Sequence, residues 1–461
     1  MIAATIGRKF LAQYNQQRGS DISAKEFFET VYFPLFYGHP KYMQWIGNSP
    51  FVQMKKGQKP HLLTQVERVE KLGNLSQKID SGEIDASTAI GYPASESEKF
   101  ATTSGQVTNL SLPVDEDTAY ASWIGSGMGI GIGGITVLFD HPLILSTIFE
   151  GWYHYRDDLN DLAYTDTPGN KINGWNAHWL THAFSNAFRT DDPRWEFPPP
   201  FEAGKEGEGL TVKRLHWLKI LLVISKKLSG TNLTGYFYHY DKTNKTFGFI
   251  PVNLPQIRRA PELYVKLFGE YAYQRDSAPI EALYGSAKSF QRVCEMGAIG
   301  VAALEPKGLR DLIPSGRGEV KSFKYDAANR ENQLTFNTYV TWLLAMLNND
   351  EFWDEAGRAA NLLLQYETAT KRKTDLSTVR INQVEDVLSA TSKRQFMNAM
   401  VPIMQSAEVK ILAELEMFVE KTHKLPNDNF PYFHALTRLR YAKQSREGTS
   451  SDNTPDLFPN N

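Results

Sequence analysis

Two histidines stand four residues apart in the segment HWLTH, a spacing that places both imidazoles on one face of a helix. His178 and His182 could therefore bind a metal ion, with His154 and the aspartates that follow it as further ligands. Trp179 replaces the glutamate of the H-E-x-x-H motif, so the general base of that motif is missing. The alternative, favoured by the aromatic residues around them, is a packed helix whose histidines are hydrogen-bonded inside the protein.

A second candidate for chemistry is the glycine-rich segment GSGMGIGIGG at 125–134. It contains G-x-G-x-x-G, but a dinucleotide site needs a strand before this motif and a helix after it. The preceding TAYASW is a weak strand and the following ITVLF is β-type, so we expect no nucleotide cofactor. The glycines then indicate either a turn or close backbone crossing, or a side-chain-free loop. In the second case Gly127, Gly129 and Gly131 would let the backbone approach a nucleic acid.

Basic and polar residues gather in several loops that contain glycine or proline, and near the end of the chain. The candidates for direct contact with DNA, besides the three glycines, are Lys55, Lys56, Lys59, Asn170, Lys171 and Asn173. The candidates for contact with a nucleic-acid backbone are Arg258, Arg259, Lys307, Arg310, Arg317, Lys371, Arg372, Arg394, Arg438 and Arg440. Each cluster alone is typical of a solvated surface. Together they predict one positive groove that binds phosphates and weakens as salt is added.

The elements that must position these residues predict a helix-rich α+β protein. We expect a mixed body over 1–335, an antiparallel helical bundle over 336–446 and a disordered tail over 447–461. Within the body, the aromatic runs 235–240 and 246–252 predict a β-hairpin, and Pro251 places its second strand at an edge.

Helices are predicted on both sides of this hairpin. Ser23 with Glu26 forms a capping box that opens an aromatic helix, which we expect to kink or end at Pro34. The other predicted helices span 64–79, 142–158, 174–188, 211–229, 260–273, 336–348, 351–371, 380–390, 393–406, 408–424 and 430–445. Residues 83–120 show little periodicity and are predicted to form a long surface excursion.

Composition excludes several classes of protein. The chain has 461 residues, enough for two or three domains, with 50 Lys and Arg against 52 Asp and Glu. A net charge of −2 is not that of a histone-like protein. The single cysteine, Cys294, excludes a disulfide framework or a zinc site built on several thiolates. No apolar run reaches the roughly 20 residues that span a bilayer, so we expect a cytoplasmic protein with no membrane contact.

Three segments give the chain a resemblance to the large subunit of a type I CRISPR surveillance complex (Cascade), in its compact I-A, I-B and Myxococcus-like forms. One is the glycine-rich segment 125–134 with the strand-like run and FDHPLILSTIFEGWYHYRDDL that follow it. Another is GNKINGWNAHWL at 169–180. The third is INQVEDVLSATSKRQFMNAMVPIM at 381–404, which is similar to the small-subunit-like bundle of such proteins.

The resemblance implies a non-catalytic subunit that binds guide RNA, double-stranded target DNA, the displaced strand and other Cascade subunits. Such a subunit recognises the protospacer-adjacent motif and helps to open the duplex, while guide pairing reads the sequence. Glycines such as Gly129 would sense the motif from the minor groove, and lysines such as Lys56 would clamp duplex phosphates. The basic residues of the bundle would contact the displaced strand.

Two other functions remain open on the sequence alone. One is a metal-dependent nuclease or hydrolase built on His178 and His182. The other is a protein-interaction scaffold of another defence assembly.

Overall fold

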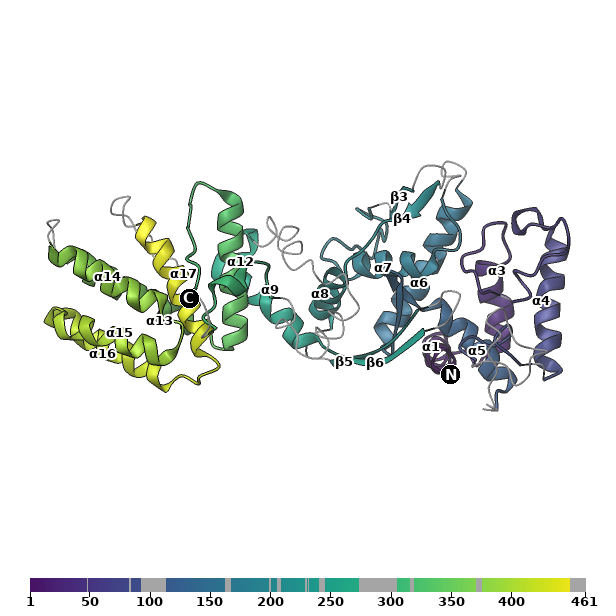
Figure 1. Cartoon of the computed structure of the whole chain (residues 1–461). Coiled ribbons are helices and arrows are strands. Elements are labelled where there is room, and N and C mark those ends of the chain that lie inside the picture. Colours follow the sequence, from purple (N-terminus) through teal and green to yellow (C-terminus); the bar gives the residue numbers. More distant parts are fainter. Residues whose placement is uncertain are drawn as a thin grey trace. The chain divides into compact units, whose positions relative to one another are not determined.

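The computed structural model divides into two compact units, Met1–Pro255 and a second that begins at Gln256. It describes residues 1–47, 49–82, 84–92, 113–161, 167–198, 200–204, 209–228, 230, 232–239, 245–272, 305–315, 319–369 and 375–447. Helices predominate, and the strands form one four-stranded and one two-stranded antiparallel sheet (Figure 1). The predicted helix-rich α+β class is confirmed.

The helices of the first unit pack around a core rich in aromatic rings. They are α1 (Ile2–Arg18), α2 (Ala24–Phe27), the π-helix η1 (Phe28–Tyr32), α3 (Phe33–Phe36), the 3₁₀ turn η2 (Pro60–Leu62), α4 (Gln65–Asp80), α5 (Glu116–Gly127), α6 (Pro142–Asn160), α7 (Ile172–Ala183) and α8 (Trp217–Lys227). Trp123, Trp152 and Trp175 are fully buried among them. The predicted surface excursion is corrected in part, because α5 begins at Glu116 with Asp115 as its N-cap. Residues 93–112 lie outside the described ones.

Both predicted helix starts near the N-terminus are confirmed. The Ser23 side chain accepts a hydrogen bond from the Glu26 backbone N–H, and Thr64 forms a reciprocal capping box with Glu67. The aromatic helix does not end at Pro34. It widens into η1 just before the proline, which then occupies the first turn of α3, where its missing N–H is tolerated.

The four-stranded sheet has the order β1-β2-β5-β6, with β1 (Ile130–Ile132), β2 (Ile135–Phe139), β5 (Asn232–His239) and β6 (Lys245–Asn253). The predicted hairpin is therefore confirmed as β5 and β6, with β6 at an edge of the sheet. On one face, Trp217 of α8 packs against Phe237 with ring centroids 5.5 Å apart. The smaller sheet pairs β3 (Phe201–Ala203) with β4 (Leu210–Val212).

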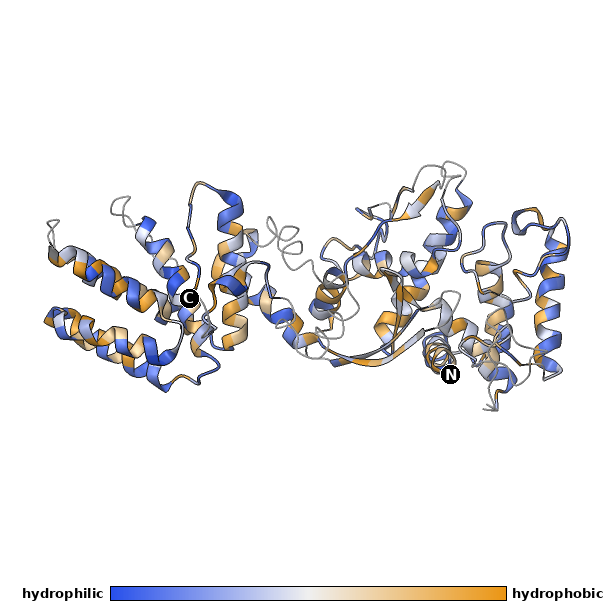
Figure 2. Ribbon diagram, viewed as in Figure 1, coloured by the Kyte–Doolittle hydropathy of each residue, from blue (hydrophilic) through white to orange (hydrophobic). Residues whose placement is uncertain are grey.

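The second unit consists mainly of helices. They are α9 (Leu254–Phe268), which starts at the unit boundary, the 3₁₀ turn η6 (Leu309–Leu312), α12 (Arg330–Leu347), α13 (Phe352–Thr368), α14 (Asp375–Ser389), α15 (Lys393–Ser406), α16 (Val409–Lys424) and α17 (Phe430–Glu447). Hydrophobic residues form a stripe along one side of the bundle helices, as amphipathic packing requires (Figure 2).

The division of the chain falls at Pro255, whereas the sequence predicted a boundary between residues 335 and 336. Contacts with the bundle explain the difference. The Asn337 side chain donates a hydrogen bond to the Tyr264 hydroxyl at 3.2 Å, and Lys266 pairs with Asp350 at 2.7 Å. These contacts make α9 part of the second unit.

Among the described residues, the structure contains no helix whose length and apolar content would let it cross a lipid bilayer.

Helices α1 and α5 cross so closely that glycine is required at the contact. A Cβ on Gly7 would lie 1.9 Å from the Ala121 carbonyl oxygen, and one on Gly125 would lie 1.8 Å from that of Ala3. Because both obstacles are backbone atoms, neither can move aside without separating the helices.

We expect Gly7→Ala to lower the free energy of unfolding by about 3 kcal/mol, since overpacking forces the two backbones apart. Urea unfolding followed by tryptophan fluorescence measures the change. Gly73→Ala is the matched control, because Gly73 is an exposed position of helix α4 with open space where a Cβ would lie. That change should stabilise the protein by roughly 0.5–1 kcal/mol. Equal midpoints for Gly7→Ala and wild type would contradict the close crossing.

A buried histidine makes the bundle sensitive to acid. His434 is stacked on Phe430 and meets the edge of Phe396. Burial, and then the charge of Arg438, lowers the pKa of His434 to about 3. The neutral ring therefore contributes its full stability above the unfolded-state pKa of about 6.5. That contribution decreases as the pH falls from there toward 3, by roughly 1.4 kcal/mol per pH unit.

We expect His434→Phe to flatten the loss of stability between pH 7 and pH 5, because phenylalanine fills the same aromatic site without titrating. Urea unfolding at both pH values gives the comparison. A variant that loses as much stability as wild type over this interval would show that His434 is not responsible.

Candidate nucleic-acid interface

The loop that carries Lys55, Lys56 and Lys59 is held in place by two buried cations of α4. The Arg68 guanidinium donates hydrogen bonds to the carbonyls of Tyr37, His39, Pro60 and Leu63, at 3.4, 2.9, 2.7 and 3.1 Å. Lys71 donates to the carbonyls of Pro50 and Gln53. Since each end of the loop is bonded to a rigid helix, the loop has a defined position.

The second predicted loop, GNKIN, reaches the same part of the first unit. The Asn170 N–H donates to the Tyr42 carbonyl at 2.6 Å, and the Ile172 N–H donates to that of Met43 at 3.2 Å. Lys41 donates to the Thr167 carbonyl at 3.2 Å. Segment 37–43 thus contacts Arg68 at one end and residues 167–172 at the other. The structure therefore brings these two predicted basic loops to the two ends of one short segment.

The lysines of these loops differ in their availability. Lys55 pairs with Glu70 at 3.1 Å. Lys56, Lys59 and Lys171 are exposed, and none forms an ion pair with another described residue. Three solvated ammonium groups are thus left free to bind phosphate.

The predicted glycine loop is corrected by the structure. Gly127 is the last residue of α5, and Gly129 and Gly131 lie at the start of the β1–β2 hairpin, where Gly129 is buried. A Cβ on any of the three would clash with a side chain at 2.7–2.9 Å, so the glycines serve close packing. The first of the two alternatives, a turn and close backbone crossing, is the one observed.

Asparagines of α7 explain why this backbone is packed so tightly. Asn176 is fully buried and donates to the carbonyls of Gly127 and Gly129, both at 2.8 Å. Asn173 packs against Gly131 and donates to the Thr136 hydroxyl at 3.5 Å, so its predicted contact with DNA competes with an internal role. The sequence reasoning missed Asn176, although its place three residues after Asn173 puts both on one helix face.

His178 and His182 do lie on one helix, but the Nε2 atom of each ring is already engaged by a backbone carbonyl. His178 Nε2 lies 2.8 Å from the Lys213 carbonyl oxygen, and His182 Nε2 lies 3.0 Å from that of Pro193. Burial lowers the pKa of both imidazoles. His154 instead packs on the Trp179 ring, and no group of three or more potential metal ligands occurs among the described residues. The packed aromatic helix with hydrogen-bonded histidines is confirmed.

Three of the residues predicted to contact a nucleic-acid backbone in the second unit form ion pairs within it. Arg258 pairs with Glu262 at 2.5 Å, Arg259 with Asp350 at 3.3 Å, and Arg310 loosely with Glu305 at 3.9 Å. Lys307 and Arg394 are exposed, with no ion pair to another described residue. Arg317, Lys371 and Arg372 lie outside the described residues.

Arg438 and Arg440 face inward, and this corrects their predicted role as strand contacts. Arg438 donates to the carbonyls of Leu312, Val320 and Lys321 at 3.0, 3.3 and 2.7 Å, and burial lowers its pKa to about 10. Arg440 covers the Trp353 ring at 3.9 Å from its centroid. Both guanidinium groups are engaged within the unit and are not free for phosphate.

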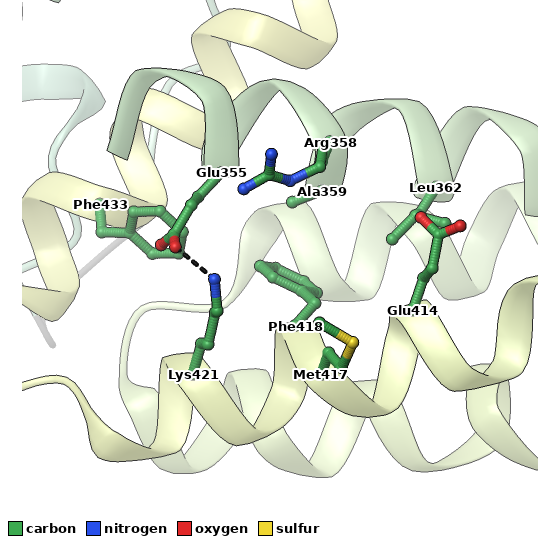
Figure 3. Close-up of a pocket in the computed structure, with 9 residues that line it drawn as sticks. All are labelled: Glu355, Arg358, Ala359, Leu362, Glu414, Met417, Phe418, Lys421 and Phe433. Atoms are coloured by element: carbon green, nitrogen blue, oxygen red, sulfur yellow. Dashed lines mark hydrogen bonds and ion pairs between the residues drawn. The ribbon is translucent and has the colours of Figure 1, made fainter. Parts of the chain in front are cut away.

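A small pocket lies between α13 and α16, with a cavity volume of about 110 Å³ (Figure 3). Glu355 and Lys421 form an ion pair across it, beside Met417 and Phe418. Pockets for drug-sized ligands measure roughly 300–1,000 Å³, so this one is too small for such a substrate.

The outward face of the β5–β6 hairpin carries aromatic residues that the sequence reasoning assigned only to a strand. Tyr236 and Phe249 are cross-strand partners with ring centroids 5.2 Å apart, and Phe249 is 62% exposed. The runs GYFYHY and FGFIP are aromatic or apolar at most successive positions, so the sequence alone gave no signal for which rings face outward. With Phe237 and Ile250 on the buried face, alternation places Tyr236 and Phe249 on the other.

We expect Arg68→Met to loosen the basic loop and to lower the free energy of unfolding by roughly 3 kcal/mol or more, because four carbonyls lose their donor. Limited trypsin digestion after Lys55 and Lys56 measures the loosening. Arg189→Met is the control, since Arg189 is exposed and its guanidinium contacts only nearby side chains, Asp191 in an ion pair and the Trp195 ring, among the interactions described. Cleavage of Arg68→Met at the wild-type rate would show that the anchor is dispensable.

Comparison with known proteins identifies no family for this chain. No protein-family model, curated protein or solved structure matches the chain. The resemblance to the large subunit of a CRISPR surveillance complex therefore stays a prediction, and the function has to be argued from the residues described above.

Proposed function

We propose that this chain is a non-catalytic nucleic-acid-binding subunit of an RNA-guided antiviral defence complex. In this proposal it recognises the protospacer-adjacent motif in target DNA and stabilises the opened duplex, in contact with guide RNA and other subunits. The observation that carries the proposal is the meeting of the two basic loops at segment 37–43. Fixed loops with free cations can follow a phosphate backbone, which sets register and orientation on a duplex.

The distribution of charge supports the same surface. Residues 1–255 carry 24 Lys and Arg against 26 Asp and Glu, and residues 256–461 carry 26 of each. Binding of a polyanion therefore depends on local segregation of charge. In the first unit, α7, α8 and the four strands of the larger sheet contain no aspartate or glutamate.

The structure changes which residues the proposal rests on. Lys56, Lys59, Asn170 and Lys171 remain as the duplex contact, because they are exposed. Lys307, Arg310 and Arg394 remain as candidates in the second unit. Motif sensing by a buried glycine such as Gly129 is not proposed again.

We expect the triple variant Lys56→Ala, Lys59→Ala, Lys171→Ala to weaken binding of any duplex sequence. Each lost phosphate contact should flatten the plot of log affinity against log salt by about one unit, since fewer counterions are released. Fluorescence anisotropy with a labelled 20-base-pair duplex between 50 and 200 mM salt measures both effects.

The control carries the same change in charge elsewhere, with Lys324, Lys410 and Lys424 replaced by alanine. All three are exposed residues of the second unit. If both triple variants lose the same affinity, binding follows net charge and the loops are not a site.

A protein-interaction scaffold is the second candidate, and one surface favours it. Leu62, Val66 and Val69 expose 64%, 79% and 53% of their areas around the start of α4. Exposed apolar clusters of this kind are typical of protein contacts. The same surface also fits a subunit that binds nucleic acid within a larger assembly.

A further inference from the structure

The β5–β6 hairpin has two faces with different neighbours. Leu233, Phe237, Ile250 and Val252 are buried, and Trp217 of α8 covers this face at Phe237. The opposite face turns the register rows Thr234–Pro251 and Tyr236–Phe249 outward. Phe249 is 62% exposed and lies against Tyr236, so this face presents a pair of aromatic rings that is accessible to a planar ligand.

The outward rings form a continuous group. Tyr236 lies 5.2 Å from Phe249 and 5.8 Å from Tyr238, measured between ring centroids. Tyr238 is buried, and it pairs across the sheet with Thr136, to which Asn173 donates its hydrogen bond. The rings therefore run from the edge strand toward the start of α7, where Lys171 lies.

The surroundings of the rings are suited to a polyanion. The strands of this sheet carry no acidic residue, and neither do the two helices that pack on it. On the side toward which the rings run, Lys171 is an exposed cation at the start of α7. A neutral protein surface would not require this absence of carboxylates, whereas a phosphate chain would.

We propose that the outward face of β5–β6 is a stacking platform for unpaired bases of single-stranded DNA, with Tyr236 and Phe249 as the stacking rings. Every base has a π-face, so aromatic platforms bind single strands with little sequence preference. The Tyr236 hydroxyl lies 3.1 Å from that of Thr246 and shares a hydrogen bond with it. Because the Tyr236 hydroxyl is already hydrogen-bonded, we do not expect it to contact the 2′-hydroxyl of a ribose. This favours DNA over RNA as the ligand.

The stacking rings are different residues from those of the basic loops, although Lys171 lies toward one end of the platform. The platform depends on the proposed function only in that both bind nucleic acid. Fluorescence anisotropy of the full chain with 5′-labelled dT15 tests it, beside a 15-base-pair duplex and rU15. We expect Phe249→Ala and Tyr236→Ala each to weaken dT15 binding roughly 5- to 150-fold, the usual range for loss of one stacking contact. Duplex affinity should stay unchanged.

Two further variants control the experiment. Trp195→Ala removes an exposed aromatic ring outside the sheet and should leave dT15 binding at the wild-type level. Tyr236→Phe keeps the ring without its hydroxyl and should bind dT15 as wild type does. Wild-type affinity of Phe249→Ala for dT15, an equal loss in Trp195→Ala, or tighter binding of rU15 than of dT15 would each overturn the proposal.

Photocrosslinking of wild-type protein keeps the test independent of folding of the variants. An oligonucleotide with 5-iodouracil in place of thymine should crosslink to Tyr236 or Phe249, as identified by mass spectrometry. Crosslinks found only at other residues would overturn the platform. If the lysine triple variant keeps its duplex binding while these crosslinks form, the proposed duplex contact fails and the platform stands.

Discussion

Hydrogen bonds from inward-facing cations to backbone carbonyls hold the irregular parts of this protein together. Arg68 binds four carbonyls from two stretches of loop, and Arg438 binds three in the second unit. Arg156 does the same for Leu35 and Lys41, and burial lowers its pKa to about 10. A carbonyl buried without a donor is destabilising, and a guanidinium supplies several donors in a fixed plane. Loops without regular secondary structure thereby become rigid enough to present other side chains.

This constraint separates the basic residues into two groups with different consequences for function. Arg68 and Lys71 position the loop, whereas Lys56 and Lys59 on the same loop are exposed to solvent. The same division appears in the bundle, where Arg438 faces inward and Arg394 faces solvent. A positive surface on a chain with no excess of positive charge depends on such a division. It also depends on the absence of carboxylates from the larger sheet and its two helices.

Close backbone packing explains the other feature that the sequence left open. The glycine-rich segment looked suited to approach a ligand, but its partners are other parts of the chain, Trp152 for Gly127 and Asn173 for Gly131. Only Gly133 and Gly134 form an exposed turn, with φ of +61° and +85°, as a two-residue hairpin requires. Glycine is needed for a close approach in either case. The presence of glycine therefore does not show whether the close neighbour is a ligand or another part of the chain.

The sequence by itself determined the local elements and their faces. Capping by Thr64 and Glu67 set the start of α4, and alternation along β5 and β6 set which of their residues share a face. These features arise from interactions within a few residues or across one hairpin. The tertiary structure alone decided that Arg68 and Arg438 turn inward, that α9 joins the bundle and that His178 and His182 meet carbonyls. Those outcomes depend on carbonyls and side chains that are distant along the chain, so no local sequence pattern predicts these contacts.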